Sequence, residues 1–63
     1  MTLRQLRERK GLTQKDLAQS VGVDQSAVSL WEKGKTMPRA DVAIKLTQLL
    51  DCTLDDIYRA KQI

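Results

Sequence analysis

Apolar side chains recur at helical spacing in two short segments of the first half of the chain: Leu17, Ala18 and Val21, then Val28 and Trp31. The segment Gly22-Val23-Asp24 lies between them. Glycine adopts the positive φ that ends many helices, valine can point inward, and aspartate is a favoured N-cap residue. The pattern therefore predicts two short helices joined by a tight turn of about three residues.

Two helices joined in this way form a helix-turn-helix. The outer face of the second helix carries Gln25, Ser26, Ser29, Leu30 and Lys33. Most of these side chains form hydrogen bonds and only one is charged, a mixture that suits the reading of base edges. An ordinary helical hairpin with a polar surface is the alternative interpretation.

Capping boxes predict where three of the helices begin, because a threonine followed three residues later by Gln or Asp satisfies two free N–H groups. The pairs are Thr2 with Gln5, Thr13 with Asp16, and Thr53 with Asp56. The helix that begins after Asp24 should run from about 25 to 33 and end at Gly34. Pro38 is expected in the first turn of the next helix.

In that fourth helix, Ala43, Leu46, Thr47 and Leu50 share the inward face, and the Thr47 hydroxyl should bond a backbone carbonyl one turn back. Val42, Ile44 and Leu49 fall partly elsewhere and are the candidate dimer surface. The last helix should bury Leu54 and Ile57, with Tyr58 at its edge. The fold class is all-α: a compact bundle of five helices, forming one domain over residues 1–63.

Composition narrows the classes of function. With 63 residues, no histidine and one cysteine, the chain offers no metal site, cofactor loop or nucleophile, and we expect no enzyme, no cofactor and no small-molecule ligand. Cys52 fits a small core residue. No apolar run approaches the about 20 residues of a membrane helix. We therefore expect a soluble, cytoplasmic protein.

Charge is distributed unevenly along the chain. Residues 1–39 hold eight basic and four acidic side chains, whereas residues 40–63 hold three basic and four acidic ones. The basic half contains the predicted helix-turn-helix, which favours a phosphate backbone as partner. Gln14 and Lys15, at the start of the second helix, could hold a phosphate. Gln14 could also be a surface residue of the first turn.

The motif Gly11-Leu12-Thr13-Gln14-x-x-Leu17-Ala18, followed by Gly22-Val23 and Val28-Ser29-x-Trp31-Glu32-x-Gly34-x-x-x-Pro38, resembles the Cro and repressor-type (XRE) helix-turn-helix family. The likeness continues to Ile57. It implies a five-helix domain that binds double-stranded DNA. Such domains usually act as homodimers on an inverted-repeat operator, with the third helix in the major groove.

The resemblance also implies roles for single residues. Base-edge contacts fall on Gln25, Ser26 and Ser29, and Leu30 could contact a thymine methyl group or only contribute packing. Phosphate contacts fall on Gln14, Lys35 and Arg39. Lys15 at the start of the second helix and Lys33 on the outer face of the third are further candidate phosphate contacts from their position and charge, not from the resemblance. Arg7 and Glu32 match a structural salt bridge between the first and third helices, and Trp31 matches a core anchor.

We therefore expect a sequence-specific transcriptional regulator, with repression favoured over activation. A protein-interaction module, such as an antitoxin with secondary DNA binding, is the competing interpretation. A third interpretation is that the chain is one domain of a longer repressor; the initial methionine and the absence of a trailing linker argue against it.

Overall fold

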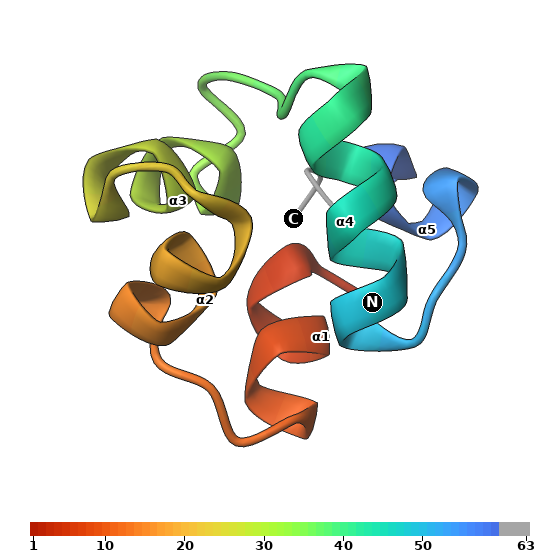
Figure 1. The fold of residues 1–63 in the computed structure, drawn as a ribbon. Helices are drawn as coiled ribbons and strands as arrows, with labels where there is room; N and C mark the ends of the chain where they lie inside the picture. The colour runs from red at the N-terminus through yellow and green to blue at the C-terminus, as the bar shows by residue number, and fades with distance from the viewer. Residues whose placement is uncertain (60–63) are drawn as a thin grey trace.

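A computed structural model describes residues 1–59 of the chain. It contains five helices: α1 (Leu3–Arg9), α2 (Gln14–Val21), α3 (Gln25–Glu32), α4 (Ala40–Leu50) and α5 (Leu54–Arg59). Turns and loops connect them, and residues 1–59 include no β-strand. In Figure 1, α2 and α3 lie on one side of α1, and α4 and α5 lie on the other. This confirms the all-α, five-helix fold.

All three predicted capping boxes are present. At α2, the Thr13 hydroxyl accepts the N–H of Asp16 at 3.0 Å, and the Asp16 carboxylate accepts the N–H of Thr13 at 3.0 Å. The same exchange joins Thr2 to Gln5 and Thr53 to Asp56. Each box supplies partners for N–H groups that have no acceptor within the helix.

The other two helix starts differ from the predictions. Asp24 is the N-cap of α3, but its exposed side chain makes no capping hydrogen bond, so water is left to solvate the first N–H groups. Pro38 lies before α4 rather than in its first turn. The extended backbone of Arg39 (ψ 162°) makes that residue the N-cap, and Pro38 is buried in the preceding loop.

The turn between α2 and α3 forms as predicted. Gly22 has φ +77°, a left-handed conformation that residues with a Cβ adopt at a cost. The N–H of Val23 then bonds the carbonyl of Ala18 at 2.9 Å. Val23 packs partly buried against the core. The turn thus fixes the direction in which α3 leaves α2.

One apolar core lies between the helices. Its members are Leu3, Leu6, Leu17, Ala18, Val21, Val28, Trp31, Val42, Ala43, Leu46, Leu50 and Ile57. The predicted inward face of α4 is correct. The Thr47 hydroxyl donates to the carbonyl of Ile44 at 2.6 Å, as expected for a polar group at the edge of that face.

Two predictions about surface and core are wrong. The sequence predicts Val42 on the candidate dimer surface, but this residue is only 7% exposed. Because α4 contacts both α2 and α5, its buried face is wider than one helical stripe. The sequence predicts Leu54 in the core, yet this residue is 43% exposed, since the short α5 turns only Ile57 inward. Of the other two dimer-surface candidates, Ile44 is exposed and Leu49 is half-buried.

No helix within residues 1–59 combines the length and the apolar character needed to cross a membrane.

Candidate nucleic-acid interface

The two faces of α3 have opposite environments. Val28 and Trp31 are buried in the core, which fixes the inner face. Gln25 and Ser26 are exposed, Leu30 is 40% exposed, and Ser29 is half-buried. The predicted base-reading side chains therefore lie on the face directed away from the core.

A buried ion pair joins α1 to α3. Arg7 Nε donates to Glu32 Oε2 at 2.6 Å, and Arg7 Nη2 donates to Glu32 Oε1 at 3.3 Å. Arg7 Nη1 also donates to the carbonyl of Leu12 at 2.8 Å. The hydrogen bond to Glu32 raises the pKa of Arg7. The two side chains are 10% and 7% exposed, so Arg7 serves as the structural partner that the resemblance implies.

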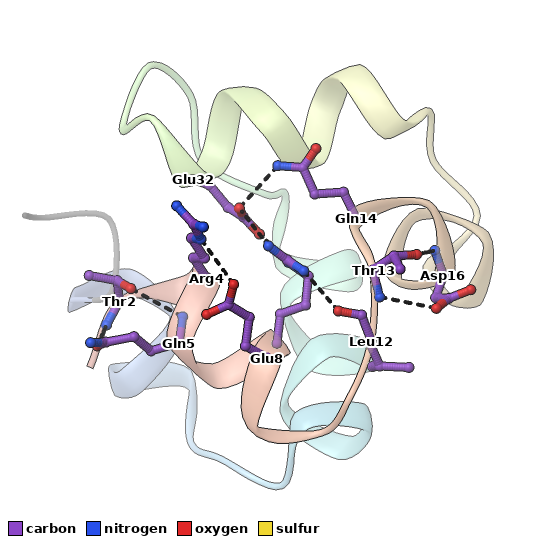
Figure 2. A network of polar contacts seen from close by, with 10 residues as sticks. Thr2, Arg4, Gln5, Glu8, Leu12, Thr13, Gln14, Asp16 and Glu32 are labelled. Carbon is purple, nitrogen blue, oxygen red and sulfur yellow. Dashed lines mark hydrogen bonds and ion pairs between the residues drawn. The ribbon is translucent and has the colours of Figure 1, made fainter.

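Gln14 extends this pair to α2. Its amide nitrogen donates to Glu32 Oε1 at 3.0 Å (Figure 2). Side chains from α1, α2 and α3 therefore meet at one carboxylate. Sequence reasoning missed the contact between Gln14 and Glu32, because 18 residues separate them and no local spacing predicts it.

A pocket of about 260 Å³, lined by polar and charged residues, opens beside this network. It is lined by Thr2, Arg4, Gln14, Ser29, Glu32 and Lys33. The structure thus brings together three residues that the sequence assigned to DNA separately, namely Gln14, Ser29 and Lys33. It adds Arg4 and Thr2 from the beginning of α1, for which sequence reasoning gave no role in binding.

The remaining predicted phosphate contacts lie outside the pocket. Lys15 is exposed in the first turn of α2, and Lys35 and Arg39 are exposed in the loop between α3 and α4. The Arg39 guanidinium lies 3.6 Å from the Asp41 carboxylate. Exposed pairs of this kind contribute little to stability, so Arg39 can leave Asp41 at small cost.

The cysteine does not offer a reactive site. Cys52 packs half-buried against the core. Burial raises the pKa of its thiol, and Asp56 raises it further. The neutral thiol is a poor nucleophile.

Comparison with known proteins gives a consistent result. A family model described as helix-turn-helix matches residues 3–57. An HTH-type transcriptional regulator of Archaeoglobus fulgidus, itself uncharacterized, is 32% identical over 56 residues, which are 89% of this chain and 80% of that protein. No solved structure gives a significant match.

Two longer relatives match over nearly the whole of this chain. A Pyrococcus furiosus protein, provisionally named an HTH-type transcriptional regulatory protein, is 42% identical over 94% of the chain. The HTH-type transcriptional activator BcrR of Enterococcus faecalis is 33% identical over 97% of it. The chain spans only 20% of the first protein and 30% of the second.

The family match runs from the start of α1 into α5, and it includes the turn at Gly22 and the anchored α3. The chain therefore belongs to the XRE-type helix-turn-helix family of DNA-binding domains.

Proposed function

We propose that the protein binds double-stranded DNA sequence-specifically as a homodimer and regulates transcription, with α3 in the major groove. The supporting observation is the division of α3 into a buried face and a polar outer face, held in orientation by the Arg7–Glu32 pair. A helix reads base edges only if its position relative to the groove is fixed. As a regulator of genes, such a protein would act in the cytoplasm, beside the chromosome.

In this proposal, α3 supplies the base contacts. Gln25, in the first turn, bonds N6 and N7 of adenine through its amide. Ser26 and Ser29 add hydroxyl groups that can donate or accept. Leu30, 40% exposed, contacts a thymine methyl group.

Residues around α3 supply the phosphate contacts. Gln14 donates one amide N–H to Glu32, and its second N–H is left for a phosphate oxygen. Lys15, Lys33, Lys35 and Arg39 contribute positive charge, which the phosphate backbone attracts whatever the base sequence.

The proposed homodimer would match a two-fold operator, on which two copies bind half-sites about one helical turn apart. Ile44, 49% exposed on α4, is the retained candidate for the contact between subunits, with half-buried Leu49 beside it in sequence. Repression is the expected outcome, because a dimer that covers promoter DNA excludes other proteins from it.

Selection from a pool of randomised duplexes tests this function. Enrichment of an inverted repeat, bound more tightly than random duplex at several salt concentrations, is the expected result. An unpaired half-site would contradict the homodimer. Salt-sensitive binding without any enrichment would contradict sequence reading.

A protein-interaction module is the second candidate function. Ile44, Leu54 and Tyr58 are the exposed large apolar side chains of α4 and α5, and they are the candidates for its contact surface. Sedimentation of the wild type and of an Ile44→Asp variant separates the two functions in part. A wild-type dimer that the variant converts to monomer supports the homodimer. A wild type that stays monomeric on operator DNA contradicts it.

A further inference from the structure

The pocket between α1, α2 and α3 contains positively charged side chains that have no role in the proposed base contacts. Arg4 and Lys33 are its two cations, and Glu32 is its one carboxylate. Arg7 neutralises Glu32 through two hydrogen bonds, and Gln14 supplies a third donor to that carboxylate. The negative charge of Glu32 is therefore compensated within the protein. Arg4 and Lys33 give the pocket its positive character.

Some of the N–H donors of the Arg4 guanidinium are not engaged in hydrogen bonds. Its Nε bonds the Glu8 carboxylate at 3.1 Å, in an exposed pair whose side chains are 68% and 52% exposed. Within residues 1–59, its two Nη groups make no hydrogen bond. A guanidinium binds phosphate oxygens through two parallel N–H bonds. The bond to Glu8 through Nε leaves the Nη groups for that purpose.

The pocket is also placed where DNA would pass. It is lined by Ser29 from the outer face of α3 and by Gln14, the proposed phosphate ligand on α2. Gln25 and Ser29 on α3 and Lys33, the residue that caps its C-terminus, follow one another at four-residue intervals, so they form one line along the helix. A backbone strand next to the groove that α3 occupies would run past the Lys33 end of this line.

We propose that this pocket holds a single backbone phosphate of duplex DNA, with Arg4 as its main ligand beside Lys33 and the free amide N–H of Gln14. The inference rests on the proposed function, since it places one further contact on the same duplex. It adds α1 to the DNA-binding surface, which otherwise consists of α2, α3 and the loop before α4. The contact adds affinity and orientation without reading bases.

The test compares Arg4→Gln with Lys10→Gln in the full chain. Both changes remove one positive charge. Lys10 lies at the other end of α1, 3.8 Å from Asp51, and outside the pocket. Binding to a random duplex is measured between about 50 and 200 mM salt, where each lost phosphate contact lowers the slope of log K against log salt by about 0.9. We expect that decrease for Arg4→Gln and an unchanged slope for Lys10→Gln. Equal slopes for the two variants would overturn the inference.

A second measurement locates the phosphate. Single methylphosphonate substitutions, each of which removes one backbone charge, are scanned across the selected operator. Wild-type protein should lose affinity at one position per half-site where Arg4→Gln loses none. If both proteins lose affinity equally at every position, Arg4 holds no phosphate, although the proposed function stands. If the wild type binds no duplex at all, the proposed function fails and this inference with it.

Discussion

The first three helices and the last two are held together by different kinds of contact. A buried polar network joins α1, α2 and α3 at Glu32. Helices α4 and α5 pack through apolar residues such as Leu46, Leu50 and Ile57. Hydrogen bonds are directional, whereas apolar burial is not. The orientation of α3 is thus specified more narrowly than that of α5.

The two regions also differ at their surfaces. Residues 1–39 hold the excess of basic over acidic side chains and line the pocket beside Glu32. The last two helices leave Ile44, Leu54 and Tyr58 exposed. A charged ligand that must be met in a fixed geometry fits the first region, and an apolar protein surface fits the second. Under the proposed function, the DNA contacts fall in the first region and the proposed contact between subunits falls in the second.

The largest expected effect comes from breaking the network in the first region. Arg7→Ala leaves Glu32 buried without its cation, and losing one partner of a buried pair costs about 3–5 kcal/mol. Arg4→Ala removes only an exposed pair with Glu8, worth about 0–1 kcal/mol. Thermal or urea unfolding of the two variants should show a much lower midpoint for Arg7→Ala. Equal midpoints would contradict a structural role for Arg7.

The packing of α4 in the second region should depend mainly on apolar burial. Leu46 is fully buried on α4 and Ile44 is 49% exposed on the same helix. Leu46→Ala should cost about 2–5 kcal/mol in the free energy of unfolding, because it leaves a cavity. Ile44→Ala, the matched control, should change it by less than about 1 kcal/mol, since much of its side chain is already in water. Urea unfolding measures both, and similar losses would show that the exposed side chain is packed in solution.

The next effect concerns DNA rather than folding. Gln25→Ala should weaken the selected operator by about 1–3 kcal/mol and relax the preference at one base pair. Lys35→Gln should weaken operator and random duplex alike and lower the salt slope by about one. Titration of both variants against both duplexes distinguishes the two roles. If Gln25→Ala weakened both duplexes equally, the assignment of base reading to Gln25 would be wrong.

Features set by neighbouring residues were predictable from the sequence. The capping boxes, the turn at Gly22 and the inward face of α4 depend on spacings of a few residues, which a helix converts directly into geometry. The two errors arose from packing between helices. Val42 is buried because α4 has neighbours on two sides, and Leu54 is exposed because α5 is too short to turn both of its apolar residues inward. Helical periodicity within one segment predicts neither the burial of Val42 nor the exposure of Leu54.

The candidate site divides in the same way. The outward face of α3 could be predicted from the apolar positions on its inner face. The partnership of Arg7 with Glu32, 25 residues apart, followed only from the family resemblance, and charge alone would have directed Arg7 to DNA. The Gln14–Glu32 hydrogen bond and the place of Arg4 in the pocket required the structure. Both depend on how three separate helices converge, which no single stretch of sequence records.

The smallest predicted effect is a pH dependence that both regions share. Hydrogen bonds from Thr13 and Thr53 lower the pKa of Asp16 in α2 and of Asp56 in α5. A carboxyl whose pKa is lower in the folded state stabilises the fold above its unfolded pKa of about 3.9. That stabilisation is lost as pH falls through the folded value.

Asp16→Asn and Asp56→Asn should therefore each reduce stability slightly near neutral pH and flatten the loss of stability in acid. Asp24→Asn is the control, since the Asp24 side chain makes no capping hydrogen bond. The effect is measured as the thermal midpoint of each variant from pH 7 to about pH 2. This pH range spans the unfolded pKa of aspartate. A flattened acid limb for Asp16→Asn alone would show that only the α2 box contributes in solution. It would then extend the contrast between the two regions to their helix caps.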